Sequence, residues 1–353
     1  MVPPVDQPEL GLTPVANRPC NLAIIGCGAF GTKHAEALGR VPTARLVAVW
    51  DPDAARARQL GRCYAADVAS SAEDIWQRGD IDGVILATPT DTHHALTLAA
   101  ANAGKHVLVE KPVALSLPEL DDMQRAAAAA RTLLMVGQTL RFHPVAQAMH
   151  RAAREGDVGQ PVFFNWVSDS ARSWPSGWQA WQTDPARSGG MALHLGVHGI
   201  DLALWLLDSA PERVYAQGAN LASPGLRVYD SLQIGVRCAN GANALVELHL
   251  NLPAEHALYQ AASLLGTRGQ AQWTNRDDGL YVGRGGVRLI DNGYDQSLRD
   301  ELAHFVDCCQ QRREPSITPE QVKWVLAAAL AANRSLESGQ AVVIGDVPGG
   351  GRS

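Results

Sequence analysis

The chain has 353 residues, of which 46% are hydrophobic and 19% are charged, and its formal net charge is −6. This length allows two domains with a core each, and the composition is that of an ordinary globular protein. The negative net charge gives no electrostatic attraction toward nucleic acid or an anionic membrane, so neither is expected as a partner.

The two ends, residues 1–20 and 346–353, are expected to be flexible tails. The first lacks the basic region and apolar core of a secretion signal, and no apolar run approaches the roughly 18 residues of a membrane span. The six cysteines show no paired metal-ligand spacing, so no metal site is expected. We therefore expect a cytoplasmic protein.

Residues 21–140 alternate short apolar runs with Ala-rich helical stretches. The expected strands are LAIIG (22–26), LVAVW (46–50), VILAT (84–88), HVLVE (106–110) and LLMVG (133–137). Near-continuous apolar strands that alternate with helices indicate a parallel sheet covered on both faces. The first domain is therefore predicted to be a Rossmann dinucleotide-binding domain.

Residues 141–345 follow another pattern, with strict alternation of apolar and polar residues at 231–238 and 244–251. This period favours a largely antiparallel sheet with one face packed and one face open. An apolar helix at 191–207 precedes these strands, and two helices at 297–311 and 319–337 follow them. The overall prediction is an α/β fold, with a Rossmann domain followed by an α+β domain for substrate binding and oligomerisation.

A glycine-rich motif, GCGAFG, directly follows the first strand and opens a helix. In this context its glycines permit a tight turn, and the start of the helix offers free N–H groups to a pyrophosphate. The expected cofactor contacts here are Gly26, Gly28, Ala29, Phe30 and Gly31.

Asp51 ends the second strand, about 20 residues after the motif, where a carboxylate accepts hydrogen bonds from the adenosine ribose and repels a 2′-phosphate. NAD is therefore the expected cofactor. NADP is the alternative, since Arg56 or Arg58 can hold its extra phosphate. A structural interpretation stays open as well, in which Asp51-Pro52-Asp53 only caps the next helix.

Lys111 follows Glu110 at the carboxyl end of the strand HVLVE, the edge at which open α/β sheets bind ligands. A lysine beside an oxidised nicotinamide has its pKa lowered by a like charge and by desolvation, which suits acid–base chemistry. The alternative is an ordinary surface lysine after a strand.

Several motifs in order along the chain resemble one known family. They include GCGAFG, ATPTDTHHALTLAAANAGKHVLVEKPVAL, VGQTLRFHP and SGGMALHLGVHGIDLALWLL, and the resemblance covers about residues 21–344. The family is that of glucose–fructose oxidoreductase, inositol dehydrogenase and the rhizopine-catabolism proteins (Gfo/Idh/MocA). The resemblance implies hydride transfer between a nicotinamide and a hydroxyl or keto carbon of a small polyhydroxylated substrate: a sugar, an inositol or a related polyol.

The resemblance also implies roles for single residues. Lys111 matches the lysine that hydrogen-bonds the reacting oxygen, and His198 matches the histidine that exchanges the hydroxyl proton. Thr88, Pro89 and His93 match positions beside the cofactor, and Glu110 lines its pocket. The Lys111-Pro112 bond is expected to be cis. Asp201, one helical turn after His198, is expected to orient that histidine.

The sequence departs from the family at His194, where many members carry Asp. His194 and His198 are four residues apart and share a helical face. Three hypotheses remain for His194: it orients the substrate, it is a satisfied polar helix residue, or it joins His198 and Asp201 in a metal site. A neutral His194 keeps the pKa of His198 low, whereas an Asp would raise it.

Other polar and aromatic residues have two interpretations each. The tryptophans Trp166, Trp174, Trp178 and Trp181 either pack between the domains or stack on a sugar ring. Arg172 and Arg187 flank them and can contact hydroxyls or a carboxylate. Glu247, His249 and Asn251 share the open sheet face and are either interface or solvated residues, since the resemblance implies that a homodimer or homotetramer forms through this face.

Two other function classes remain as alternatives. Related proteins include glycosidases or lyases that retain NAD and use transient oxidation, and regulators that bind a nicotinamide or ligand without turnover. The presence of both Lys111 and His198 argues against the second class.

Overall fold

The computed structural model of the chain describes residues 18–171, 180–253, 256, 258–276, 279–282, 286–289 and 294–347. Most of both expected tails, together with Arg172, Trp174 and Trp178, lies outside these residues.

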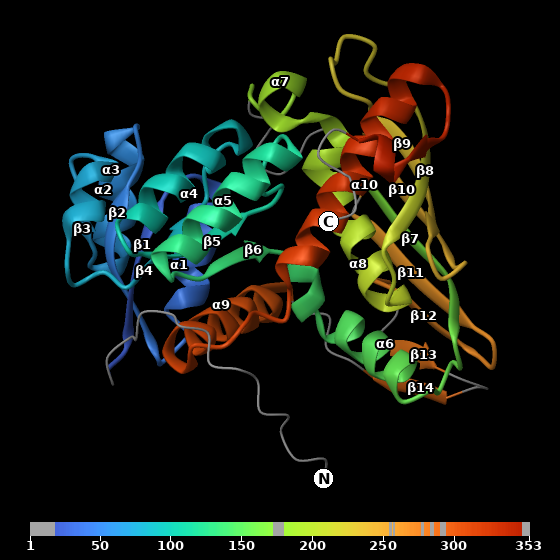
Figure 1. Cartoon of the computed structure of the whole chain (residues 1–353), viewed down its shortest axis with the longest axis horizontal. Helices are drawn as coiled ribbons and strands as arrows, with labels where there is room; N and C mark the ends of the chain where they lie inside the picture. The colour runs from blue at the N-terminus through green and yellow to red at the C-terminus, as the bar shows by residue number, and fades with distance from the viewer. Residues whose placement is uncertain are drawn as a thin grey trace.

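The N-terminal part is a six-stranded sheet with the order β3-β2-β1-β4-β5-β6. All of its strand pairs are parallel, and helices cover both faces (Figure 1). The strands are β1 (Cys20–Ile25), β2 (Ala44–Trp50), β3 (Asp67–Val68), β4 (Gly83–Leu86), β5 (His106–Glu110) and β6 (Leu134–Gly137). The helices are α1 (Ala29–Leu38), α2 (Ala54–Tyr64), α3 (Ala72–Gln77), η1 (Thr90–Thr92), α4 (His93–Asn102), α5 (Leu117–Ala130) and η2 (Thr139–Phe142). This order is that of a doubly wound nucleotide-binding sheet, as the alternating pattern predicted.

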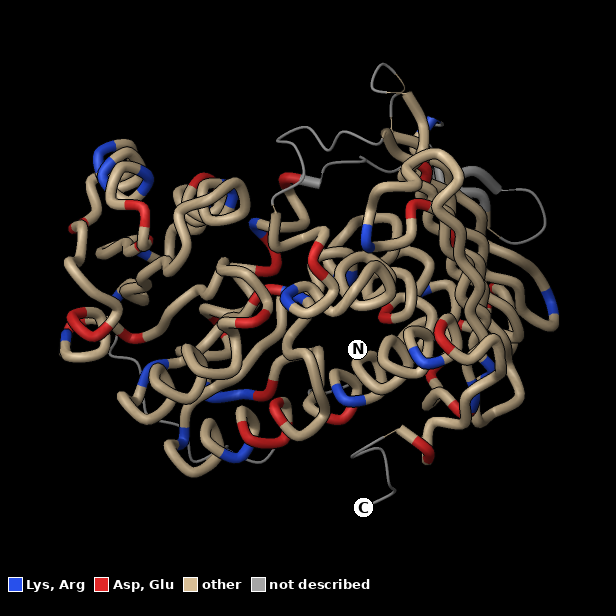
Figure 2. Tube along the Cα trace, turned by 90° about the horizontal axis from the view of Figure 1, so that it is seen from above, with Lys and Arg blue, Asp and Glu red and all other residues tan. Residues whose placement is uncertain are grey.

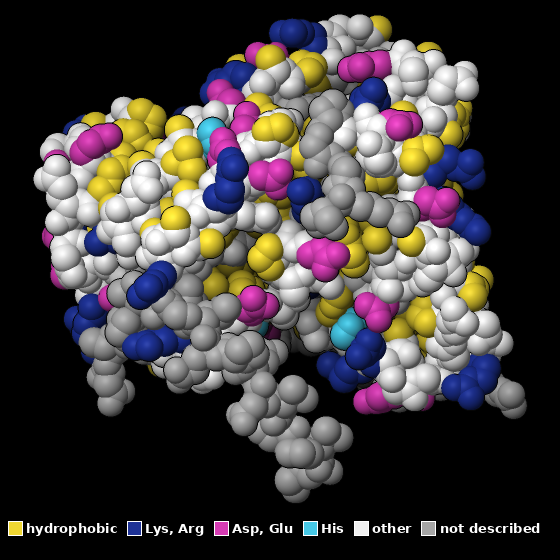
Figure 3. Space-filling model, in the orientation of Figure 1, with side chains coloured by type: hydrophobic (Ala, Val, Ile, Leu, Met, Phe, Trp, Pro, Cys, Tyr) yellow, Lys and Arg dark blue, Asp and Glu magenta, His cyan; other side chains and the backbone are white. Residues whose placement is uncertain are grey.

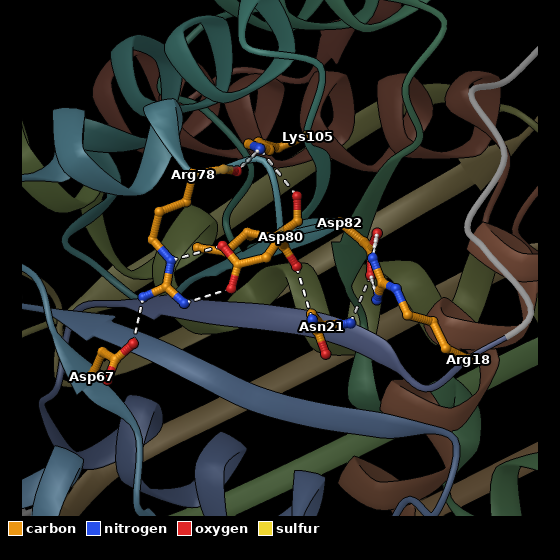
Figure 4. A network of polar contacts seen from close by, with 8 residues as sticks. Arg18, Asn21, Asp67, Arg78, Asp80, Asp82 and Lys105 are labelled. Atoms are coloured by element: carbon orange, nitrogen blue, oxygen red, sulfur yellow. Dashed lines mark hydrogen bonds and ion pairs between the residues drawn. The ribbon is translucent and has the colours of Figure 1, made fainter.

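A polar network closes the amino-terminal edge of this sheet (Figure 4). Arg18 makes a bidentate ion pair with Asp82, just before β4, and Lys105 donates to two backbone carbonyl oxygens next to α3. The strand β1 begins at the buried Cys20, one residue before the expected start of the domain. The network supplies hydrogen-bond partners for the loops at this edge. The candidate active site lies at the opposite edge, where the strands have their carboxyl ends.

The C-terminal part is a nine-stranded sheet with the order β14-β13-β12-β11-β7-β10-β9-β8-β15. The pair β7–β10 is parallel and the others are antiparallel, so the expectation of a largely antiparallel sheet is confirmed. The strands are β7 (Pro161–Ala171), β8 (Pro211–Ala219), β9 (Ser231–Cys238), β10 (Asn243–Leu252), β11 (Tyr259–Gly266), β12 (Gln270–Thr274), β13 (Gly279–Val282), β14 (Gly286–Leu289) and β15 (Val342–Val343).

Among the described residues, helices cover one face of the nine-stranded sheet, and no helix lies on the other face, which we call the bare face (Figure 1). The helices of this part are α6 (Pro144–Arg154), α7 (Pro185–Ser188), η3 (Ala192–Gly196), α8 (Val197–Leu207), α9 (Tyr294–Gln311), α10 (Pro319–Ser338) and η4 (Ile344–Asp346). α8 and α10 pack together on the covered face. Because only this face is covered, apolar buried residues alternate with polar, more exposed residues along β9 and β10. α10 begins with the Thr318 side chain accepting from the Gln321 N–H and with Pro319 in its first turn, as expected.

α9 returns to the N-terminal part of the molecule, where it packs against α1, β1 and η2. Its residues Leu298, Leu302 and Phe305 are buried. The range 141–345 expected for the second domain therefore includes a helix that contributes to the core of the first sheet.

The stretch Pro185–Leu207 is long and apolar enough to cross a membrane by length and composition. However, 78% of its apolar window is buried inside the molecule, beneath the sheet and against α10. Packing within the protein thus accounts for this stretch.

Candidate active site

The turn between β1 and α1 uses its three glycines in different ways. Gly26 has φ +94°, and a Cβ there would overlap the carbonyl oxygen of Ala87. A Cβ on Gly31 would overlap the carbonyl oxygen of Gly26. A Cβ on Gly28 would meet nothing within 4 Å. Two glycines therefore close the turn, and the third leaves open space at the start of α1.

This open space fits the phosphates of a dinucleotide. Gly28 is the N-cap of α1 and contributes no side chain to the first N–H groups of the helix, which remain donors for an anion. Ala29, which is exposed, and Phe30 form the first turn.

Asp51 lies against the same turn. Its Oδ2 accepts from the Cys27 N–H at 2.7 Å and its Oδ1 accepts from the Asp53 N–H at 2.8 Å. The side chain of Asp53, rather than Asp51, caps α2. The capping interpretation thus holds for Asp53, while Asp51 is fixed beside the cofactor turn. Arg56 forms an ion pair with Asp53 at 3.3 Å.

His93 ties together two loops at the carboxyl edge. Its Nδ1 lies 2.9 Å from the carbonyl oxygen of Pro112, and its Nε2 lies 2.9 Å from that of Thr88. The ring is buried, which lowers the pKa of His93. Thr88 also accepts a hydrogen bond from Thr92 through its hydroxyl. The expected cofactor residues of this loop are therefore held in place by the loop that follows β5.

Glu110 pairs with a residue that the sequence did not single out. Its Oε1 lies 2.7 Å from Nε2 of His34, a fully buried residue of α1, and its Oε2 accepts from the Lys111 N–H at 3.1 Å. This pairing lowers the pKa of Glu110 although burial opposes it. The sequence did contain a sign of His34, because it is a polar residue on the side of the expected helix that faces the core.

Lys111 connects the two parts of the molecule. Its Nζ donates to the carbonyl oxygen of His194 at 3.1 Å and lies 5.9 Å from the centre of the Phe30 ring. Burial lowers the pKa of Lys111, and Glu110 partly offsets this effect. The Lys111-Pro112 bond is cis, as the resemblance implied.

His194 lies in η3, a short π-helix that continues into α8. Such wide turns occur often at functional sites, and the periodicity of the sequence gives no sign of them. The side-chain amide nitrogen of Gln182 lies 3.3 Å from Nε2 of His194, and the Trp181 ring stands edge-on to the His194 ring at 5.3 Å. Gln182 was missed because nothing in the sequence links it to His194.

His198 follows one turn later on α8. Burial lowers the pKa of both histidines well below the ordinary value, and the positive charge of Lys111 adds to this effect. A positive charge on His194 would lower the pKa of His198 further. Within the described part of the chain, Nδ1 of His198 has no hydrogen-bond partner.

Asp201 does not orient His198 as expected. Its two oxygens accept from Nε and Nη2 of Arg141, both at 2.7 Å, and both side chains are buried. The reason is that the buried Arg141 guanidinium needs a carboxylate partner, and its third contact goes to Oε1 of Gln321 at 2.7 Å. The metal hypothesis thereby loses one of its ligands, and among the described residues no group of three metal-type side chains comes together.

The segment 180–191, which we call the strap, contacts both the second domain and the loop after β4 in the NAD-binding domain. Besides the contacts of Trp181 and Gln182 with His194, its Asp184 pairs with Arg227 at 3.2 Å. Its Arg187 makes a bidentate ion pair with Asp91 of η1 at 2.8 and 3.3 Å. The strap therefore joins the cofactor loop to the sheet domain.

Among the described residues, Trp166, Glu247 and His249 make no hydrogen bond to the residues of this site. Trp166 is buried under α8, where a Cβ on Gly199 would lie 2.5 Å from its ring, so it packs in the core. On the bare sheet face, Glu247 accepts from Asn165 at 3.0 Å, and His249 pairs with Ser231 at 2.9 Å.

Comparison with known proteins agrees with this arrangement. Residues 20–138 match the oxidoreductase family with an NAD-binding Rossmann fold, and residues 146–272 match the GFO/IDH/MocA C-terminal domain. The chain belongs to the Gfo/Idh/MocA oxidoreductase family. Its first domain is thus an NAD-binding Rossmann domain, as the glycine turn and Asp51 predicted.

Relatives within the Gfo/Idh/MocA family cover most of the chain. An inositol 2-dehydrogenase of Rubrobacter xylanophilus is 31% identical over 71% of this chain and 70% of its own. The scyllo-inositol 2-dehydrogenase (NAD(+)) of Bacillus subtilis is 27% identical over 91% of this chain and 95% of its own. The structure of a myo-inositol 2-dehydrogenase from Lactobacillus plantarum, 22% identical, matches 92% of this chain and 99% of its own with a TM-score of 0.81, which shows the shared fold.

Proposed function

We propose that this protein transfers a hydride between NAD and a hydroxyl or keto carbon of a polyol such as an inositol or a sugar. The observation that carries the proposal is the position of Lys111. Its Nζ lies at the carboxyl edge of the NAD-binding sheet and contacts the π-helix that holds His194, one turn before His198. The names of the inositol dehydrogenase relatives support the substrate class.

When bound, the nicotinamide supplies the hydride chemistry, and the protein supplies orientation and proton transfer. Lys111 donates a hydrogen bond to the reacting oxygen. His198, which burial keeps neutral, accepts the hydroxyl proton through a ring nitrogen during oxidation and returns it during reduction. His194, held by Gln182, positions a neighbouring hydroxyl.

The proposed cofactor contacts extend along the carboxyl edge of the sheet. Asp51 accepts from the ribose hydroxyls, which favours NAD over NADP. The other proposed contacts are Gly26, Gly28, Ala29, Phe30, Gly31, Thr88, Pro89, His93, Glu110 and Lys111.

The first test is NADH formation by the purified protein with NAD or NADP and a panel of inositols, sugars and sugar acids. Steady formation of NADH with one class of compound supports the proposal. If keto compounds with NADH also fail, and polyols do not stabilise the NAD-bound protein, the proposal is wrong. Release of a free sugar without net NADH would instead identify an NAD-retaining glycosidase.

The roles of Lys111 and His198 make a separate prediction. Lys111→Met and His198→Gln should each lower kcat with the active substrate by about a hundredfold or more, since each removes a proton-transfer group. The Kd for NAD should change little. Lys323→Met and His256→Gln change the same residue types at the surface and should keep full activity. Full activity in either active-site variant would contradict its role.

We also propose a cytoplasmic homodimer or homotetramer that assembles through the bare sheet face. All six cysteines are unpaired, which fits a reducing compartment. Tyr215 and Leu265 are 47% and 36% exposed on two separate strands of that sheet. Light scattering of the purified protein measures the assembly directly, and a monomer at micromolar concentration would contradict it.

A further inference from the structure

Arg187 and Asp91 form an ion pair that the proposed mechanism does not use. Nε and Nη2 of Arg187 lie 2.8 and 3.3 Å from the two carboxylate oxygens of Asp91. The residues come from different domains, because Asp91 lies in η1 after β4 and Arg187 lies in α7 of the strap. A guanidinium that binds both oxygens of a carboxylate fixes orientation as well as distance. The pair therefore sets how the strap lies against the loop after β4.

α7, the helical turn that carries Arg187, is held in the second domain at both of its ends. At its start, Asp184 caps the helix and pairs with Arg227 at 3.2 Å. At its end, Gly189 has φ +77°, and its carbonyl oxygen accepts from the Asn333 amide of α10 at 2.7 Å. Arg187 is therefore part of an anchored turn, from which it reaches across to the NAD-binding domain.

The start of the strap contacts His194. The side-chain amide nitrogen of Gln182 lies 3.3 Å from Nε2 of His194, and the Trp181 ring stands edge-on to the same ring. Lys111 reaches His194 from the NAD-binding domain, since its Nζ donates to the His194 carbonyl oxygen. The His194 side chain thus contacts the strap, and its backbone contacts the proposed catalytic lysine.

These contacts form a closed path around the proposed reacting centre. Asp91 comes three residues after Thr88, whose carbonyl oxygen lies 2.9 Å from Nε2 of His93. Nδ1 of His93 lies 2.9 Å from the carbonyl oxygen of Pro112, next to Lys111. The contact of Lys111 with His194 and the strap complete the path back to Asp91.

The ion pair is the part of this path that lies at the surface. The side chains of Arg187 and Asp91 are 42% and 29% exposed. Exposed ion pairs add little to the stability of a fold. The main consequence of this pair is therefore the arrangement of the segments that it joins.

We propose that Arg187 and Asp91 are positioning residues that couple NAD binding to the strap and, through it, to His194. The part of this inference that concerns the polyol rests on the proposed function. NAD contacts Thr88 and Pro89 in that proposal, on the loop that carries Asp91. NAD that holds this loop in one arrangement also holds Asp91 toward Arg187, and the strap then orders the His194 side chain before the polyol binds. Because coupling between two sites is reciprocal, bound polyol also tightens NAD binding.

Hydrogen exchange of the strap measures this coupling without turnover. The N–H groups of Arg187, Ser188 and Gly189 are hydrogen-bonded within α7, so their exchange requires the turn to open. Saturating NAD should slow exchange in peptides that cover residues 180–191 of wild type, and this effect should be at least halved in Arg187→Gln.

Arg154→Gln is the matched control, because it breaks another exposed arginine–aspartate pair, one that lies within the second domain. Its strap should respond to NAD as the wild-type strap does. Equal NAD-dependent protection in wild type and Arg187→Gln, or no protection in wild type, would overturn the coupling.

Steady-state kinetics with the active polyol separate positioning from catalysis. Arg187→Gln and Asp91→Asn should each raise KM for the polyol about twofold to fivefold, the range of an exposed ion pair, while kcat stays within about twofold. The double variant should match the single variants, since one pair can be lost only once. Added NaCl should raise KM in wild type but not in Arg187→Gln, because salt screens the pair.

Two kinetic results would contradict the pair. Additive effects in the double variant would show that the residues act separately. A raised KM in Arg187→Gln with a wild-type KM in Asp91→Asn would show that Arg187 contacts the substrate itself. If wild type turns over no polyol, the proposed function fails, and hydrogen exchange still decides whether NAD and the strap are coupled.

Discussion

At the scale of single residues, a pair of buried histidines, His194 and His198, lies one helical turn apart at the proposed reacting centre. Lys111 and burial keep both rings neutral at neutral pH. A neutral His198 has a free site to accept a proton, although its lowered pKa makes it a weaker base. The pair therefore keeps the base available over a wide range of pH.

His194→Asp should change this behaviour. The new carboxylate would raise the pKa of His198, so the fall of kcat/KM for oxidation on the acid side should move to higher pH. In wild type this fall should lie at lower pH than in His194→Asp, because burial holds the pKa of His198 well below its ordinary value. The measurement is kcat/KM for polyol oxidation as a function of pH.

His194→Asn is the matched control for this experiment, because it removes the ring without adding a charge. Its acid limb should remain where it is in wild type. If His194→Asp and His194→Asn gave the same profile, the charge at this position would have no part in setting the base.

The sequence singled out Lys111 and His198 because each lies in a motif that is continuous along the chain, and their roles stay a prediction. It assigned Asp201 the wrong partner, because spacing along a helix shows only which neighbours lie on that helix. The actual partner, Arg141, comes 60 residues earlier and reaches Asp201 through the fold. Gln182 was missed for the same reason.

At the scale of elements, the turn between β1 and α1 contains one glycine that the fold requires, Gly31, and one that we propose for cofactor binding, Gly28. Gly31→Ala should lower the stability of the free protein by about 1–3 kcal/mol, since its Cβ would overlap the carbonyl oxygen of Gly26. Gly28→Ala should leave the Tm unchanged, since its Cβ meets no atom and its φ of −75° suits alanine. The same Cβ would occupy the space proposed for the pyrophosphate, so the Kd for NAD should rise at least tenfold.

Calorimetry and NAD titration of the two variants separate these effects. Unchanged NAD affinity in Gly28→Ala would mean that the pyrophosphate does not approach this turn. A loss of stability in both variants would show that all three glycines serve the fold.

The type of each sheet was predictable, because period-two alternation and continuous apolar runs report how many faces of a strand are buried. The π-helix that carries His194 was not, since an extra residue in one turn leaves the apolar pattern nearly unchanged. The position of α9 was not predictable either. Its amphipathic pattern shows that one face is buried, but the partners α1 and β1 come from the other end of the chain.

At the scale of the whole molecule, charge is spread rather than concentrated. Figure 2 shows basic and acidic residues interspersed along the trace, and Figure 3 shows the same mixture with scattered hydrophobic side chains on one face. Specificity has to come from groups buried at the junction of the two sheets.

The buried ion pair between Arg141 and Asp201 holds this junction together. Arg141 lies in η2, just after the last strand of the NAD-binding sheet, and its partners Asp201 and Gln321 come from α8 and α10. The helix that carries His198 is thus fixed to the domain that carries Lys111. Because both charges are 2% exposed, the loss of one leaves the other without compensation.

Asp201→Asn should therefore lower the free energy of unfolding by about 3–5 kcal/mol, measured by urea denaturation. Disrupting the exposed pair of Arg154 and Asp208 with Arg154→Met should cost about 0–1 kcal/mol. Arg141→Met combined with Asp201→Leu should recover much of the loss, since it removes both buried charges together. If Asp201→Asn instead kept wild-type stability and lost only activity, Asp201 would act on His198 after all, and the ion pair would not be what joins the two domains.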